Sequence, residues 1–234
     1  MSRLRGLPLP RIGPYGAALV LVLGFAFVLR VWGAKHGLPY AYNADENAHF
    51  VPRAIGMFLT GGDPMYYVNP AAYTNVLYLV FDVWFGGRAG VSKAYATNPE
   101  EVFLVARISA AVLGTVAIWL LYLAGKRFFE PRVGLLAAGL LAVSFLPVFY
   151  AHLALNDVPT LAPIALSLYG TAGILREGRT RDYVIAGLGL GVAAATKYTG
   201  GIVLVPLVAA AAAQFFAPGG RTPALRGLLI AAGC

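Results

Sequence analysis

The sequence has little charge and only one cysteine. Of its 234 residues, 12% are charged and 59% are hydrophobic, and the mean hydropathy is +0.72. This balance excludes a soluble globular chain, in which about 25% of residues are charged. The single Cys234 excludes an intrachain disulfide framework and a thiol-based metal motif. An integral membrane protein is the class that remains.

Other familiar signals are missing as well. The chain has no glycine-rich phosphate loop of the P-loop or dinucleotide type, so it gives no sign of a nucleotide-sugar site. It also has no internal repeat, low-complexity tract or separate soluble domain. We therefore expect one membrane domain over residues 1–234.

What the chain has instead is long apolar runs of a length that suits membrane-spanning helices. These runs are Tyr15–Gly33, Val102–Gly125, Val133–Ala151, Val158–Leu175, Tyr183–Ala195 and Gly200–Phe216. Another run begins near Ala224 and stops at Cys234, so we expect the protein to continue beyond it. Unbroken apolarity excludes the alternating strands of a barrel. The predicted fold is all-α, a polytopic transmembrane helical bundle.

Basic residues between the runs predict the orientation of the bundle, because Lys and Arg are enriched in cytoplasmic loops. The clusters are Arg3, Arg5 and Arg11; Lys126, Arg127 and Arg132; Arg176, Arg179 and Arg181; and Arg221 and Arg226. All fall on one side, which predicts a cytoplasmic N-terminus (residues 1–14) and a cytoplasmic location for the whole net charge of +8. Topology then explains the basic pI without nucleic-acid binding. A cleavable signal is the alternative for the first run, but the run is long and no convincing small-residue cleavage site follows.

The first outer loop, residues 34–101, is long enough to hold structure of its own. Asp45–Thr60 is predicted to be a helix capped by Asn43 or Asp45 and ended by Gly61-Gly62. Ala71–Phe85 is predicted to be a second short helix. We expect both to lie in the membrane interface, since the first has an apolar face formed by Ala48, Val51, Ile55, Phe58 and Leu59. Tyr and Trp residues would form an aromatic belt: Tyr66, Tyr67, Tyr73, Tyr78, Trp84 and Tyr95.

Ionisable residues gather at the predicted outer face, where they are functional candidates by default. They are Asp45, Glu46, His49, Arg30, Arg107, Asp157 and Lys197. Each also has a structural interpretation. The adjacent acids can be solvated, Asp157 can cap a helix that has Pro159 in its first turn, and the basic side chains can extend to the headgroups. His49 follows Asp45 by four residues, so the two share a helix face, as an acid–base or ligand pair would.

Four stretches resemble a known enzyme family. They are ADENAHF, ARISAAVLGTVAIWLLYLAGKRFF, FLPVFYAHLALNDVPTLAPIALSLY and GLGLGVAAATKYTG. Their order and spacing look like those of the membrane glycosyltransferases of family 39 and the wider GT-C fold, which include protein O-mannosyltransferases and bacterial aminoarabinose transferases. The resemblance runs from Asp45 to about Pro206, the N-terminal portion of such an enzyme. Where many relatives carry a His-Pro-Pro stretch, this chain reads VNPAAY over Val68–Tyr73.

The resemblance implies transfer of a sugar from a polyprenyl-phosphate carrier to an acceptor at the outer face of the membrane, with inversion at the anomeric carbon. The family's first-loop acid falls on Asp45, which would be the general base, and Glu46 would support it or contact the donor or a metal. The family's acid in the second outer loop falls on Asp157. Its basic residue after the fifth run falls on Lys197.

The chemistry of transfer fits these residue types. A carboxylate takes the proton of the attacking hydroxyl, and positive charge stabilises the departing phosphate. Lys197 and Arg107 are the candidate phosphate ligands, and His49 is a candidate substrate-binding residue beside Asp45. No cofactor is required, although Asp45, Glu46 and His49 leave a divalent metal open. The expected partners are the lipid-linked sugar donor, membrane lipid, and an acceptor that is protein, lipid or glycan.

Two other functions remain as alternatives. A transporter or flippase of a lipid-linked or anionic substrate would also place charges among helices, but transporters usually place them near the bilayer midplane in repeated halves. A non-catalytic scaffold in an envelope complex would tolerate an amide at Asp45. The sugar, the acceptor and the oligomeric state are beyond what the sequence predicts.

Overall fold

The computed structural model describes residues 13–217 and 221–234, and within these ranges the chain forms helices and turns without any strand. The predicted all-α fold is therefore confirmed. The cluster of Arg3, Arg5 and Arg11 lies outside the described residues. The helices are α1 Pro14–Val31, η1 Glu46–Phe50, α2 Val51–Thr60, α3 Ala72–Phe85, α4 Arg88–Thr97, α5 Pro99–Phe128, α6 Pro131–Val143, α7 Phe145–Ala151, α8 Leu161–Glu177, α9 Thr180–Thr196, η2 Tyr198–Val203, α10 Leu204–Phe216 and α11 Arg221–Ala232.

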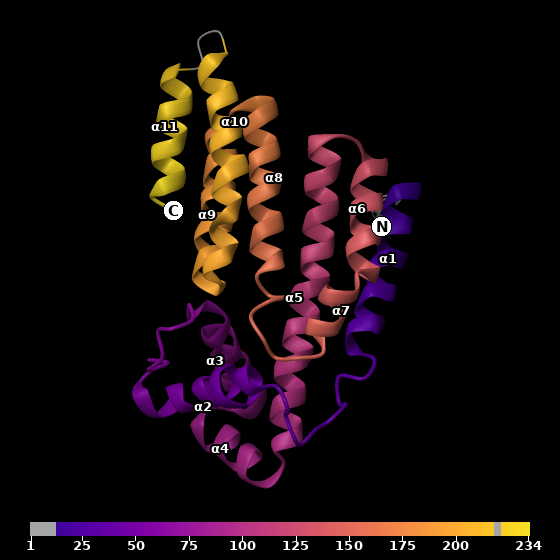
Figure 1. Cartoon of the computed structure of the whole chain (residues 1–234), viewed down its shortest axis with the longest axis vertical. Coiled ribbons are helices and arrows are strands. Elements are labelled where there is room, and N and C mark those ends of the chain that lie inside the picture. Colours follow the sequence, from indigo (N-terminus) through magenta and orange to yellow (C-terminus); the bar gives the residue numbers. More distant parts are fainter. Residues whose placement is uncertain (1–12, 218–220) are drawn as a thin grey trace, which may run out of the picture.

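The long helices run side by side, and the helices of the first loop gather at one end of them (Figure 1). We call η1, α2, α3 and α4 the first-loop helices. The described basic clusters, where α5 meets α6, where α8 meets α9 and along the first turns of α11, lie at the opposite end (Figure 1). Helix α5 extends through both regions. The structure thus places the predicted basic loops at one end of the bundle and the predicted site at the other.

Within the described residues, three helical segments are long and apolar enough to cross a membrane: α1, α5 and Tyr198–Phe216. The bent pair α6–α7 would make a fourth. The six spans expected from the apolar runs are therefore not all matched. Helices α8 and α9 contain 17 residues each, or about 25 Å at 1.5 Å per residue, whereas the hydrocarbon core is about 30 Å thick.

The third apolar run, predicted as one span, is broken in the structure. Helices α6 and α7 meet at a bend of 56°. Ser144 between them is extended, and Pro147 has no N–H to donate to the carbonyl of Val143. Two carbonyls near the end of α6, those of Leu141 and Ala142, accept hydrogen bonds of 3.1 Å from the guanidinium of Arg30 on α1. The bend therefore has a polar partner from a neighbouring helix.

Arg30 does not extend to the protein surface, as the alternative interpretation, in which it reaches the headgroups, would require. Only 1% of the residue is exposed, and α5 makes room for it at Gly114. A Cβ at position 114 would lie 3.2 Å from Arg30 Nε and 2.6 Å from a methyl carbon of Val158. Arg30 is thus a structural residue that joins α1, α5 and the α6–α7 bend.

The first-loop helices have their own buried core against the first turns of α5. It is formed by apolar side chains from each of these helices, among them Phe50, Val51, Ala54, Tyr73, Leu77, Phe81, Val91 and Phe103. The predicted apolar face is only partly correct, because Ala48 and Leu59 are exposed. Tyr73, predicted in the aromatic belt, is buried in this core. The sequence interpretation also missed α4, whose polar composition gave no apolar stripe to detect.

Candidate active site at the first-loop end

A buried ion pair lies at the centre of the candidate site. Arg107 on α5 donates from Nε and Nη2 to the two carboxylate oxygens of Glu46 at 2.7 and 2.8 Å. Glu46 is fully buried and Arg107 is 3% exposed. Two parallel, charge-assisted hydrogen bonds are the strongest form of this contact. The sequence predicted both residues in the site, but not that they bind each other.

The pair also binds two further segments of the chain. Arg107 Nη1 donates to the carbonyls of Ala34 and His36, at 2.7 and 2.9 Å. Glu46 Oε1 accepts a hydrogen bond of 2.8 Å from the N–H of Ala154, in the segment between α7 and α8. All three guanidinium nitrogens of Arg107 thus donate to protein atoms. In this arrangement Arg107 fixes the site rather than facing a substrate.

Asp45 lies directly beside this pair, and its side chain is 61% exposed. The Asn43 side chain accepts hydrogen bonds from the N–H groups of Asp45 and Glu46, at 3.0 and 3.2 Å, so the predicted cap at Asn43 is confirmed. The following turn, η1, is wider than an α-helix, and wide turns of this kind occur often at functional sites. The exposed carboxylate of Asp45 is thereby held at the start of a turn, directly before the fully buried Glu46.

His49 faces Asp45, as their spacing predicted, with 3.7 Å between Nε2 and Oδ1. Its ring stacks on Tyr66 at 4.7 Å, and Arg53 lies over the same tyrosine at 5.1 Å. His49 Nδ1 is buried without a hydrogen-bond partner among the described residues. The stack limits where the imidazole can move. Arg53 was not identified from the sequence, and Tyr66 was predicted only as part of the aromatic belt.

Asp157 and Lys197, 40 residues apart in the sequence, form a second ion pair. Lys197 Nζ lies 2.5 Å from Asp157 Oδ1, and both side chains are about one-third exposed. Asn156 supports the contact, because its amide donates to the carbonyl of Thr196 at 2.8 Å. Helix α8 begins at Leu161, so the alternative interpretation of Asp157 as its N-cap is wrong.

Contacts link this second pair to the first-loop helices. Asp157 lies three residues after Ala154, which binds Glu46. On the other side, Tyr198 donates to the carbonyl of Tyr67 at 3.4 Å. The segment between α7 and α8 passes between the bundle and the first-loop helices (Figure 1). Glu46, Asp157 and Lys197 therefore belong to one layer, in which the bundle meets the first-loop helices.

Two tyrosines of this layer differ in their surroundings. Burial, and then the negative charge of Glu46, raise the pKa of Tyr73 well above its usual value. Its hydroxyl donates to the carbonyl of Ala106 at 3.2 Å, so Tyr73 is a neutral structural residue. The hydrogen bond from Tyr67 lowers the pKa of Asp63, and the same bond raises the pKa of Tyr67. Asp63 thus stays ionised in the loop between α2 and α3, which also contains Tyr66 and Tyr67.

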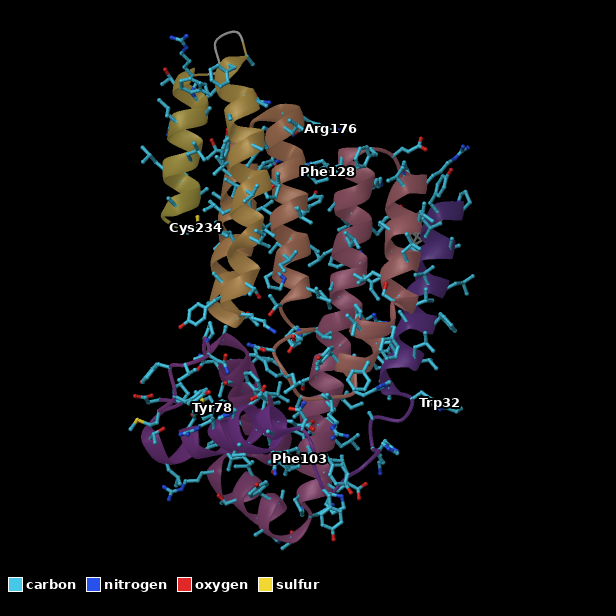
Figure 2. The ribbon with its side chains drawn as sticks, viewed as in Figure 1. Trp32, Tyr78, Phe103, Phe128, Arg176 and Cys234 are labelled. Carbon is cyan, nitrogen blue, oxygen red and sulfur yellow. The ribbon has the colours of Figure 1, made fainter. Side chains whose placement is uncertain are left out.

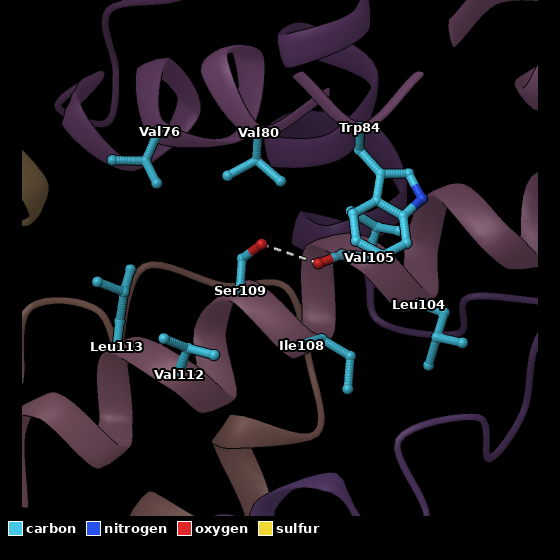
Figure 3. A pocket seen from close by; sticks show the side chains of 9 residues that line it. All are labelled: Val76, Val80, Trp84, Leu104, Val105, Ile108, Ser109, Val112 and Leu113. Atoms are coloured by element: carbon cyan, nitrogen blue, oxygen red, sulfur yellow. Dashed lines mark hydrogen bonds between the residues drawn. The ribbon is translucent and has the colours of Figure 1, made fainter. Parts of the chain in front are cut away.

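An apolar groove of about 500 Å³ lies between α3 and α5. Figure 3 shows side chains of both helices around it, including Val76, Val80 and Trp84 from α3. Ser109 is the one hydroxyl residue of the lining, and it donates to the carbonyl of Val105 at 2.8 Å (Figure 3). The groove therefore offers a dry surface suited to hydrocarbon. The exposed Trp32 also lies toward this end of α1 (Figure 2).

The three candidate metal ligands, Asp45, Glu46 and His49, do not form one cluster of free ligands. The carboxylate of Glu46 is bound by Arg107 and Ala154, which leaves Asp45 and His49 as a pair. Among the residues that the structure describes, no three His, Cys, Asp or Glu side chains are close enough to hold a metal ion.

Comparison with known proteins agrees with this architecture. A family model described as dolichyl-phosphate-mannose-protein mannosyltransferase matches residues 100–231. The match includes Arg107, Asp157 and Lys197, while Asp45, Glu46 and His49 precede it. No curated protein and no solved structure matches the chain.

Proposed function

The chain belongs to the dolichyl-phosphate-mannose-protein mannosyltransferase family, and from this premise we propose that it moves a sugar from a polyprenyl-phosphate carrier to an acceptor hydroxyl, with Asp45 as general base. It is a multi-pass membrane glycosyltransferase. The observation that supports Asp45 is the contrast between two adjacent acids: Glu46 is buried and paired, whereas Asp45 is exposed beside it. A base must reach the proton that it removes.

In the proposed reaction, the acceptor oxygen attacks the anomeric carbon while Asp45 takes the proton from that oxygen. The bond between the anomeric carbon and the phosphate oxygen breaks on the opposite face, so the configuration inverts. Polyprenyl phosphate leaves with the bonding electrons. Removing the hydroxyl proton in this way typically contributes about 10²–10⁴-fold to the rate.

Lys197 is the proposed ligand of the donor phosphate. It is an accessible cation of the layer, and its ammonium already binds one anionic oxygen, that of Asp157. A compact point charge of this kind suits phosphate. Arg107, also predicted as a phosphate ligand, makes its contacts with Glu46 and backbone carbonyls. We therefore propose that Arg107 and Glu46 position Asp45.

The donor is half lipid, and the apolar groove between α3 and α5 is the proposed path of its tail. Its lining is apolar apart from the hydroxyl of Ser109, which already donates to Val105, and the indole N–H of Trp84. Burial of apolar surface contributes about 0.8 kcal/mol per methylene group. A polyprenyl chain in this groove would leave the phosphate free to approach the polar layer.

The decisive experiment measures sugar transfer from a radiolabelled polyprenyl-phosphate donor in membranes that contain the protein. Asp45→Asn is expected to lower the rate by at least 10²-fold, since the amide cannot accept the proton. Asp82→Asn is the matched control, because Asp82 is an exposed acid on α3 that forms no ion pair with any residue that the structure describes. Equal rates for Asp45→Asn and wild type, or no transfer from a panel of donors, would refute the proposal and favour transport.

A further inference from the structure

A second polar pocket lies at the opposite end of the bundle, where the basic loops are. It has a volume of about 290 Å³ and lies between the start of α9 and the start of α11. Its lining includes Gly178, Thr180, Tyr183, Thr222, Arg226 and Gly227. None of these residues belongs to the candidate active site.

Tyr183 is the feature of this pocket that calls for a ligand. The residue is 1% exposed, yet its hydroxyl has no hydrogen-bond partner among the described residues. Buried hydroxyls in folded proteins are almost always paired, so an unpaired one needs an explanation. The ring lies against α11, because a Cβ at Gly227 would come within 2.5 Å of Tyr183 Cε2. The glycine at position 227 therefore leaves the room that the Tyr183 ring occupies.

The charge around the pocket is positive. The first turns of α9 and α11 line it, and helix N-termini carry partial positive charge and free N–H groups. Arg226 adds a full charge. The nearby acids are bound elsewhere: Asp182 lies 2.8 Å from Arg127, and Glu177 lies 2.7 Å from Arg179. Both nearby acids are thus in ion pairs with arginines.

We propose that this pocket binds a phosphate group, as carried by the headgroup of an anionic membrane lipid. Arg226 and the two threonine hydroxyls would contact the phosphate oxygens, and the Tyr183 hydroxyl would donate to one of them. Basic pockets between membrane helices are suited to such headgroups. The first turns of α9 and α11 lie at the other end of the bundle from the first-loop helices (Figure 1), so this proposal does not depend on the proposed transfer reaction.

Native mass spectrometry of the detergent-solubilised full chain tests this site. The probes are phosphatidylglycerol and phosphatidylcholine, titrated separately, with inorganic phosphate as competitor. Wild type is expected to bind phosphatidylglycerol at least 10-fold more tightly than phosphatidylcholine. Arg226→Gln should weaken phosphatidylglycerol binding roughly 10-fold, and Tyr183→Phe roughly 5-fold, because each removes one donor to a charged group.

Arg221→Gln is the matched control, since Arg221 lies on the same helix over the ring of Phe215 and outside the pocket lining. Its affinity for phosphatidylglycerol should equal that of wild type. Displacement of the lipid by millimolar inorganic phosphate would support the phosphate site and assign it to the free anion. An unchanged affinity in Tyr183→Phe, or an equal loss in Arg221→Gln, would overturn the proposal in favour of a diffuse surface charge.

Discussion

At the scale of single residues, two adjacent acids have opposite surroundings. Glu46 is completely buried and accepts three hydrogen bonds, whereas the side chain of Asp45 is 61% exposed. Removing a charge from water is costly unless the charge is paired and hydrogen-bonded, and Arg107 meets that condition for Glu46. The proposed division of labour follows: Glu46 holds the turn, and Asp45 remains available for chemistry.

Glu46→Gln is expected to destabilise the protein by about 3–5 kcal/mol, because it leaves the charge of Arg107 buried without its partner. Denaturant unfolding in mixed micelles, followed by far-UV circular dichroism, measures the change. Lys35→Gln is the control, as it breaks the exposed Lys35–Glu100 pair at 3.2 Å and should cost less than about 1 kcal/mol. Similar losses in the two variants would contradict the structural role of the buried pair.

Lys197→Gln should raise the KM for the lipid-linked donor roughly 10-fold or more, because one charge-assisted hydrogen bond to phosphate is lost. Initial-rate kinetics at varied donor concentration separate this effect from a change in kcat. Lys93→Gln on α4 serves as control, since Lys93 is exposed and forms no ion pair in the described structure. A donor KM that stays at the wild-type value would assign the phosphate to another residue.

The Asp63–Tyr67 hydrogen bond predicts that the stability of the loop between α2 and α3 depends on pH. Asp63 has a lowered pKa when folded, so its contribution to stability is present above its unfolded pKa and is lost as the pH falls through the folded value. Tyr67 has a raised pKa, so its contribution is lost only as the pH rises through that value. In Tyr67→Phe, a carboxyl ¹³C titration should show the pKa of Asp63 returning toward its ordinary value. If Asp63 titrates with the same pKa in wild type and in Tyr67→Phe, the hydrogen bond does not form.

At the scale of elements, glycines set how closely the helices approach. A Cβ at Gly170 on α8 would lie 2.4 Å from the backbone nitrogen of Ala186 on α9, a distance that flexible side chains cannot relieve. Near the bend, by contrast, α6 depends on Arg30 for its last carbonyls. Close backbone contact thus joins α8 to α9, whereas hydrogen bonds from the Arg30 side chain join α1 to the end of α6.

Gly170→Ala is expected to destabilise the bundle by about 1–3 kcal/mol, because the added methyl group forces α8 and α9 apart. Gly139→Ala provides the opposite case. No atom lies within 4 Å of a Cβ at this position in α6, so alanine should be neutral or stabilising by up to about 1 kcal/mol. Thermal inactivation of both variants in the same detergent compares them. A loss at both positions would mean that detergent contacts, rather than α9, determine the effect.

Local signals predicted much of the structure, while distant partners were out of reach. Asn43 capped its helix and Gly61-Gly62 ended it, as short-range chemistry requires. The spacing of Asp45 and His49 correctly placed them on one face. The burial of Glu46 was not predictable, since it depends on Arg107, 61 residues later. The break after α6 was missed because Pro147 lies in an otherwise continuous apolar run.

At the scale of the whole molecule, polarity is divided between the two ends of the bundle. The described basic clusters lie at one end, and the first-loop helices with the candidate active site lie at the other (Figure 1). Phe128 and Arg176 mark the basic end in Figure 2. Since basic loops are retained in the cytoplasm, we predict that the active site faces outward.

Cysteine labelling in intact cells tests this orientation. The background is Cys234→Ser, which removes the chain's single, exposed cysteine. Ser92→Cys on α4 should react with a membrane-impermeant maleimide, because its exposed side chain belongs to the first-loop helices. Glu130→Cys, at the turn between α5 and α6, should react only after permeabilisation. The reverse pattern would place the carboxylates on the cytoplasmic side, where the lipid-linked donor would have to present its sugar inward.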